Sequence, residues 1–192
     1  MKPRRTVLAL VAALVASPLV ACERTDERPT GRVTQVACPE DAIDETLMIA
    51  LGQAKNFHHK AKVYMSDGKP DLAIAAVKEV LAVRFPADAP EAEDVRADAR
   101  ALLAKLLLAQ GQLDTAMSEI DAALAAATRE SFFVANLYTV RGEILEAQAA
   151  DADAAGPAEA TRARELRRQA IVAYDKSIAI NSALQERLLG AP

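Results

Sequence analysis

One seven-residue pattern occurs twice in this chain, and it constrains the fold more than any other feature. Gly, two variable residues, Asp, a variable residue, Ala and an apolar residue follow one another at 68–74 and again at 111–117. Both copies lie between Ala/Leu-rich segments. Glycine is the usual residue in the left-handed turn that ends a helix, and an early Asp suits the positive N-terminus of the next helix. The pattern therefore predicts a repeated unit of helix, tight turn and helix.

The residues around these turns resemble the tetratricopeptide repeat (TPR), a helix-turn-helix unit of about 34 residues that stacks into a solenoid. In the first unit, Phe57, Ala61 and Tyr64 lie at the family's large, small and large positions before the glycine. The resemblance implies an all-α fold, a TPR-like solenoid of helical hairpins with about three repeats. The three units are expected at residues 54–86, 97–128 and 135–182.

Small residues are expected where the two helices of each unit approach each other. A larger side chain at these positions would wedge the pair apart. The small residues on the first helices are Ala61, Ala104 and Gly142, and those on the second helices are Ala73, Ala116 and Ala170.

The third unit is longer than the family's repeat because an Ala-rich stretch at 149–164 is inserted in it. Two extended helices explain the insertion, one from about residue 131 to 153 and one from about 158 to 181, with a turn at Gly156-Pro157. Ala, Glu and Arg favour helix, and a disordered loop is the alternative. Residues 182–189 are expected to cap the last unit, and open-ended stacking on another chain is the alternative.

The first 21 residues resemble a bacterial lipoprotein signal peptide. Three basic residues precede an apolar core that is too short to span a bilayer as a permanent helix. The core ends in Leu19-Val20-Ala21-Cys22, which is similar to the lipobox, whose cysteine is acylated and becomes the first residue of the mature protein. The resemblance implies a membrane anchor through lipid on Cys22. An ordinary cleaved signal peptide with an incidental cysteine is the alternative.

Residue 23 bears on which membrane holds the anchor. In enteric bacteria an Asp at this place retains a lipoprotein in the inner membrane, and this chain has Glu23 instead. The expected location is therefore the bacterial cell envelope, lipid-anchored in the outer membrane and facing the periplasm, with the inner membrane as the alternative. Residues 22–40 are rich in charged residues, Thr and Pro, which predicts a flexible tether before the repeat domain at 41–192.

Charge and export argue against nucleic acid as a partner. Removal of residues 1–21 would leave 20 basic and 27 acidic residues, a net charge of −7. The sequence also has no basic stripe interleaved with aromatic residues. Cys38 would then be the one remaining thiol, which is either free or forms a disulfide with a second copy or a partner. Self-association is therefore left open.

Motifs for catalysis or metal binding are absent from the sequence. His58 and His59 are the only histidines, and on a helix adjacent side chains point about 100° apart, so the two cannot readily chelate one ion. There is no His-Glu-x-x-His, no Gly-x-Ser-x-Gly and no phosphate-binding loop. The basic run at 162–168 is either a solvated face or a contact for an anion or a membrane. We therefore expect no enzyme, no metal and no cofactor.

The resemblance also places a binding surface. In TPR proteins the first helices of the units line a concave groove that takes an extended peptide or a helix from a partner. Carried over position by position, the groove residues are Lys55, His58, Lys62, Met65, Ala101, Lys105, Leu108, Asn136, Thr139 and Glu143. The expected function is a noncatalytic scaffold or assembly factor that binds another envelope protein. A regulatory subunit that binds a periplasmic enzyme such as a cell-wall hydrolase is the alternative.

Overall fold

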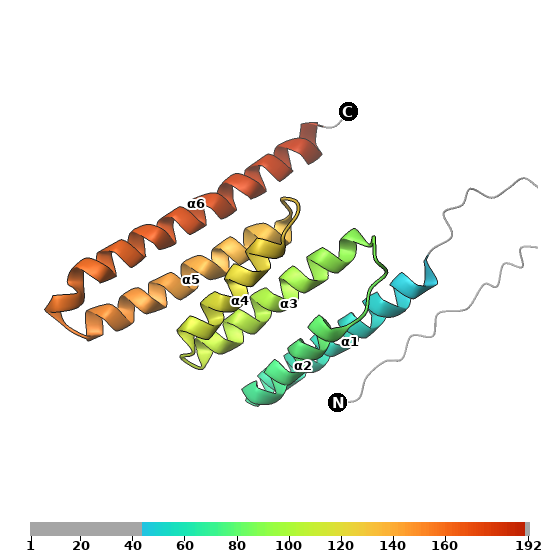
Figure 1. The fold of residues 1–192 in the computed structure, drawn as a ribbon, viewed down its shortest axis with the longest axis horizontal. Helices are drawn as coiled ribbons and strands as arrows, with labels where there is room; N and C mark the ends of the chain where they lie inside the picture. Colours follow the sequence, from blue (N-terminus) through green and yellow to red (C-terminus); the bar gives the residue numbers. More distant parts are fainter. Residues whose placement is uncertain (1–43, 191–192) are drawn as a thin grey trace, which may run out of the picture. The chain divides into compact units, whose positions relative to one another are not determined.

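The computed structural model describes residues 44–190, and every element in this range is helical (Figure 1). The predicted signal peptide, Cys22, Cys38 and the predicted tether lie outside the described residues. The all-α prediction is confirmed for the described part of the chain. In chain order the elements are α1 (Glu45–Ser66), α2 (Pro70–Ala82), α3 (Pro90–Ala109), α4 (Leu113–Ala126), α5 (Phe132–Ala154), the short 3-10 helix η1 (Pro157–Glu159) and α6 (Ala160–Gly190).

The six α-helices pack as three consecutive hairpins. α1 packs on α2, α3 on α4, and α5 on α6. Successive hairpins are joined by contacts of α3 with α2 and of α5 with both α3 and α4. Each hairpin therefore rests on its neighbours in the chain, and the three follow one another in sequence order (Figure 1).

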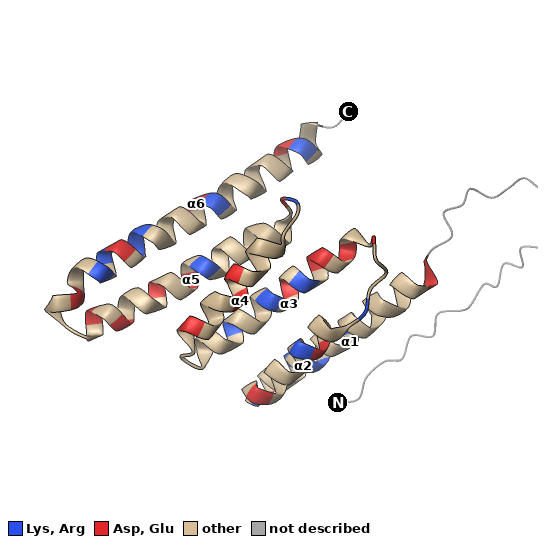
Figure 2. Ribbon diagram, viewed as in Figure 1, with Lys and Arg blue, Asp and Glu red and all other residues tan. Residues whose placement is uncertain are grey.

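Acidic residues occur on all six α-helices, and basic residues occur on all of them except α4 (Figure 2). Several of them link neighbouring helices, as when Arg141 of α5 donates to the Asp121 carboxylate of α4 at 2.6 Å. None of the helices in residues 44–190 combines the length and the hydropathy that a membrane-spanning helix needs.

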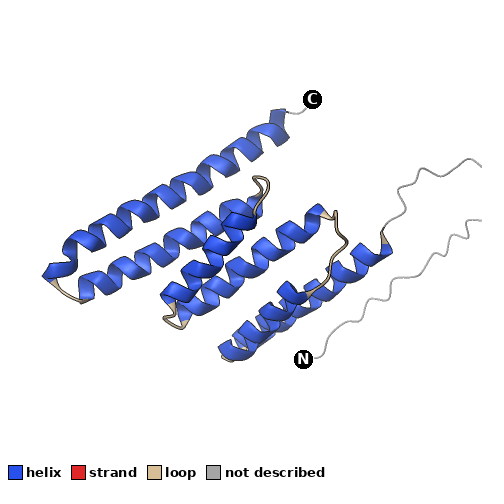
Figure 3. Ribbon diagram, in the orientation of Figure 1, coloured by secondary structure: helices blue, strands red, loops and turns tan. Residues whose placement is uncertain are grey.

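The two turns predicted from the repeated pattern have the same geometry, and both are short (Figure 3). Gly68 and Gly111 have φ angles of 68° and 74°, in the left-handed region that residues with a Cβ avoid. In each turn the amide after the glycine donates to the carbonyl five residues back, at 2.8 Å in the first turn and 2.9 Å in the second. This bond satisfies a carbonyl that the ending helix would leave unpaired. The repeated turn is thus confirmed.

The third hairpin has extended helices, as predicted, and the insertion at 149–164 is ordered. Only Ala155 and Gly156 within it lie outside a helix, so the disordered-loop alternative is wrong. The predicted helix end at about residue 181 is wrong, because α6 continues without a break to Gly190 and residues 182–189 belong to it. No Gly or Pro interrupts that segment, and Ala, Leu, Gln, Glu and Arg all favour helix.

The first and second hairpins begin earlier than the predicted unit bounds. α1 starts at Glu45, where the side chain of Asp44 accepts hydrogen bonds from the amides of Thr46 and Leu47 at 2.9 and 3.2 Å. Such a cap satisfies amides that the first turn leaves without partners. α3 starts at Pro90, a residue that suits the first turn of a helix because it has no amide proton.

Small residues line the contacts within the hairpins, as the sequence predicts. All six predicted small positions are buried, and the five alanines among them are 0–1% exposed: Ala61, Ala73, Ala104, Ala116 and Ala170. Gly142 holds the sixth position, where an added Cβ would lie only 2.5 Å from Cε1 of Tyr174. The third hairpin therefore uses a still smaller residue because a larger ring faces it.

Candidate functional site

The first helices of the three hairpins enclose a shared hollow of about 410 Å³, which we call the groove hollow. Apolar side chains reach it from all three helices: Leu51 and Ala54 from α1, Val95 from α3 and Phe133 from α5. Val80 of α2 and charged and polar side chains of α1 and α3 complete the lining. The hollow therefore offers an apolar interior beside groups that can pair with charge.

The two walls of the groove hollow carry opposite types of charge. The α1 wall holds Lys55 and the two histidines, whereas the α3 wall holds Glu91, Asp94 and Asp98. The walls approach each other where His58 Nδ1 lies 3.6 Å from Asp98 Oδ2. Burial lowers the pKa of His58 below its ordinary value of 6.5, against the opposing pull of the Asp98 carboxylate. The imidazole is therefore mainly neutral at pH 7.

Two of the predicted groove residues meet directly. Lys105 Nζ of α3 lies 3.2 Å from Glu143 Oε1 of α5, so each offsets the charge of the other. Lys55 and Lys62 of α1 are exposed and form no ion pair within residues 44–190. The positive charge that an acidic partner would meet is therefore concentrated on α1.

Two predicted residues are used inside the fold. Ala101 is only 1% exposed, so a partner cannot reach it, and its assignment to the groove surface is wrong. Thr139 is half-buried, and its hydroxyl shares a 2.9 Å hydrogen bond with the Ser177 hydroxyl of α6. The carry-over of family positions did not anticipate this bond, because it depends on how closely α5 and α6 approach.

The other predicted residues lie along the first helices with different exposure. Met65 is 44% exposed near the end of α1. Leu108 is half-buried and packs against the main core, and Asn136 is half-buried on α5. None of these three lines the groove hollow, whereas Lys55 and His58 do.

Of the eleven residues that line the groove hollow, sequence reasoning found only Lys55 and His58, and those it missed include Val95, Asp98 and Phe133. When Ala61, Ala104 and Gly142 are aligned, Asp98 takes the position of Lys55 and Asn136, both of which were predicted. Val95 and Phe133 share one position, two residues before the predicted starts of the second and third units. Groove positions extended one helical turn toward the N-terminus would have named Val95 and Phe133 as candidates, but only the packing of the hairpins shows that they line one hollow.

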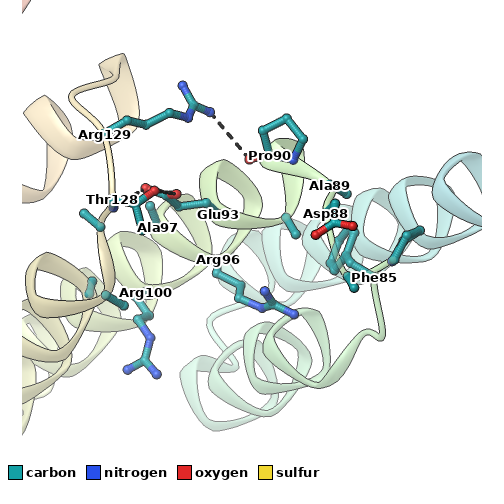
Figure 4. A pocket seen from close by; sticks show the side chains of 16 residues that line it. Phe85, Asp88, Ala89, Pro90, Glu93, Arg96, Ala97, Arg100, Thr128 and Arg129 are labelled. Atoms are coloured by element: carbon teal, nitrogen blue, oxygen red, sulfur yellow. Dashed lines mark hydrogen bonds between the residues drawn. The ribbon is translucent and has the colours of Figure 1, made fainter.

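A second hollow, of about 530 Å³, lies where the loop after α2, the start of α3 and the loop after α4 meet (Figure 4). The Glu93 carboxylate accepts hydrogen bonds from the amide and the hydroxyl of Thr128, at 2.8 and 2.6 Å. The hydroxyl contact is the main reason that the pKa of Glu93 lies below its ordinary value. Arg129 also reaches the Pro90 carbonyl at 3.5 Å. These groups bind one another, which fastens the end of the second hairpin to the start of α3.

The basic run on α6 is largely offset by acidic neighbours. Arg167 pairs with Asp153 of α5, and Arg168 pairs with Glu165 one turn earlier on the same helix. The hydrogen bond from Arg168 is the main cause that lowers the pKa of Glu165 to about 2. Both pairs are exposed to water, where such contacts contribute little to stability. These contacts favour the solvated-face alternative over a dedicated anion site.

Within residues 44–190, no cluster of three or more His, Cys, Asp or Glu side chains has the arrangement to hold a metal ion. Comparison of the chain with protein-family models, with curated proteins and with solved structures finds no match. Function is therefore inferred from the residues of the site.

Proposed function

We propose that this chain is a lipid-anchored, TPR-like protein of the bacterial envelope that binds another envelope protein as a noncatalytic scaffold or assembly factor. The observation that carries the proposal is the groove hollow, which the first helices of three consecutive hairpins line together. In a TPR-like solenoid, this is the surface that takes a peptide or a helix from a partner.

Two features of the hairpins support the TPR-like part of the proposal. The first two turns share a left-handed glycine and the same closing hydrogen bond, so the repeat is structural as well as sequential. Equivalent positions on α1, α3 and α5 also hold buried small residues, at Ala61, Ala104 and Gly142. A stack of units with the same contacts is the arrangement expected of a solenoid.

The groove hollow favours a partner segment with one bulky apolar residue, and acidic residues of that segment would lie over α1, because the α3 wall holds three carboxylates. The volume of about 410 Å³ lies at the lower end of the range for binding pockets, which suits one anchoring side chain rather than a large ligand. Lys55 and Lys62 would attract nearby carboxylates, and salt would weaken that attraction because both lysines are exposed.

Site-specific crosslinking would test the groove. A photoreactive residue would replace Lys55 in the groove hollow, and in a matched control it would replace Lys78, which is also exposed but lies on α2. We expect an envelope protein to be crosslinked from position 55 and not from position 78. The same bands from both positions would refute a groove-specific partner.

Charge reversal gives a second readout with the captured partner. Lys55→Glu combined with Lys62→Glu should weaken binding and reduce its salt sensitivity, whereas Lys78→Glu should change neither. Unchanged affinity in the double variant would remove the electrostatic part of the proposal. Capture of a cell-wall hydrolase would favour the regulatory-subunit alternative.

The anchor can be tested apart from the groove. In a Gram-negative host fed a labelled fatty acid, the wild-type chain should take up label and fractionate with the outer membrane. Cys22→Ala should lose the label, whereas Cys38→Ala should keep it. Label that survives Cys22→Ala would contradict the lipoprotein assignment, and label in inner-membrane fractions would correct the location.

A further inference from the structure

The second helices of the three hairpins align residue by residue. Ala73 of α2, Ala116 of α4 and Ala170 of α6 take the same position, and all three are buried. In this alignment several further positions are apolar in every hairpin, and at two of them the side chain is exposed only in the third hairpin. The first holds Ile74, Met117 and Ile171, and the second holds Leu81, Leu124 and Ile178.

The side chains at these two positions are partly buried in the first two hairpins and exposed in the third. Ile74, Leu81, Met117 and Leu124 are half-buried and pack against the core, because α3 follows on α2 and α5 follows on α4. By contrast, Ile171 and Ile178 are 59% and 62% exposed. Within residues 44–190, only α5 and η1 pack substantially on α6. In α6, therefore, the residues equivalent to those that contact the next hairpin are not covered by any helix in residues 44–190.

In the second and third hairpins an acidic residue lies between these two positions. Asp121 of α4 aligns with Asp175 of α6. Asp121 accepts a hydrogen bond at 2.6 Å from Arg141 of α5, the helix that stacks on α4. Asp175 makes no hydrogen bond or ion pair with any residue in 44–190. Asp175 therefore has no basic partner in residues 44–190, whereas Asp121 has Arg141.

We propose that Ile171, Asp175 and Ile178 form a stacking face that binds an amphipathic helix of another protein. These residues are spaced by four and three positions, so they lie on one side of α6. The bound helix would carry a basic residue between two apolar residues. α5 shows the pattern, because Arg141 follows the fully buried Leu137 by four residues and precedes the fully buried Ile144 by three. The stacking face is separate from the groove hollow and does not depend on its function.

A second copy of this chain matches the stacking face only in part in a head-to-tail arrangement. The helix of that copy with an uncovered outer side is α1, in which Asn56 aligns with Leu137 of α5. Leu137 is fully buried in its hairpin stack, whereas Asn56 is exposed. Burial of that amide without a partner would cost free energy. The other two positions of the pattern are matched, because Lys60 aligns with Arg141 and exposed Val63 aligns with Ile144, so Asn56 is the residue that opposes this arrangement.

A symmetric pair of α6 helices fits no better. If Ile171 lay opposite Ile178 of the second copy in an antiparallel pair, the two-fold axis would pass beside residue 175. The two Asp175 carboxylates would then face each other, and their repulsion would oppose the dimer. We therefore assign the stacking face to a helix from another protein.

A synthetic peptide of residues 131–154 is a suitable probe, because it contains the α5 helix that covers the equivalent face of α4. The partner in the assay is the chain from residue 22 to 192, with Cys22→Ala to avoid acylation. We expect saturable binding by fluorescence anisotropy. Ile178→Glu should weaken it by about 10-fold or more, since an apolar side chain loses its burial.

Val172→Glu is the matched control. Val172 is 56% exposed on the same helix, but it aligns with Ala75 and Ser118, which are exposed in their own hairpins. The control should bind the peptide as the wild type does. An equal loss of affinity in Ile178→Glu and Val172→Glu would overturn the proposal. Unchanged affinity in both variants would also overturn it, because the peptide would then bind elsewhere, as by displacing the native α5.

A charge exchange tests the basic residue of the partner helix. Arg141→Glu in the peptide should weaken binding to the wild-type chain, and Asp175→Arg in the chain should restore binding of that peptide. Absence of rescue would refute the pairing. Sedimentation of the chain alone provides the last test, because self-association that Ile178→Glu abolishes would assign the stacking face to a second copy.

Discussion

Substitution of Gly142 by Ala tests the packing of the third hairpin most directly. The added Cβ would lie 2.5 Å from Cε1 and 2.6 Å from Cζ of Tyr174, whereas real Cβ contacts are essentially never shorter than 3.0 Å. The ring cannot move freely, because its hydroxyl donates to the Glu146 carboxylate at 2.8 Å. Either the ring must leave that hydrogen bond or α5 and α6 must separate.

Two opposing effects set the magnitude. Overpacking of a buried contact costs about 1–3 kcal/mol. The same change removes a glycine from a helix interior, which stabilises by about 0.8–1 kcal/mol. Overpacking is the larger effect, so we expect a net loss of about 0–2 kcal/mol in the free energy of unfolding. In a domain of this size each kcal/mol lowers Tm by about 2–4 °C.

Urea unfolding followed by circular dichroism would measure the loss, with Tyr174→Ile as the second arm of a double-mutant cycle. Ala104 and Ile120 take the equivalent positions in the second hairpin, where both are fully buried. In the Tyr174→Ile background, Gly142→Ala should therefore stabilise, which gives a coupling of about 1–3 kcal/mol. The same effect of Gly142→Ala in both backgrounds would refute the steric argument.

Three further predictions concern other parts of the fold. Ala73→Leu should destabilise by about 1–3 kcal/mol in thermal melts through overpacking, whereas exposed Ala75→Leu on the same helix should change stability little, and equal effects would contradict the hairpin register. Gly111→Ala should cost about 1–2 kcal/mol in urea unfolding because φ is 74°, and no loss would indicate a different turn. Because the pKa of Glu93 is lowered, its contribution to stability is present above its ordinary value of 4.5 and is lost as the pH falls through the lowered pKa; Glu93→Gln should flatten that acid-side loss in melts between pH 6 and pH 3, and an unchanged slope would refute it.

The helices were predictable where local chemistry decides them. Two glycines between Ala/Leu-rich segments predicted the first two turns, because only a residue without Cβ adopts that backbone at little cost. The Gly156-Pro157 turn was predictable for the same reason, although its φ of 111° and ψ of −175° make it a different turn. Helix ends without such a breaker were predicted poorly. α6 runs past the expected end at residue 181 because nothing in the segment stops it.

The candidate site was only partly predictable. Lys55 and His58 line the groove hollow as expected, and Lys105 and Glu143 lie together. Phe133 enters the hollow from another hairpin, so the register of one unit alone could not place it there. Ala101 is buried rather than on the groove surface because neighbouring helices cover it. The spacing of residues in the sequence does not show such contacts.

The sequence by itself determined the all-α class, the positions of the turns and the small residues inside each hairpin. These features depend on backbone preference and side-chain size within a few residues of each other. The tertiary structure alone decided which apolar residues are covered. Leu124 and Ile178 are equivalent in sequence, but a following hairpin covers only the first. Burial depends on what packs against a residue, and residues distant along the chain supply that contact.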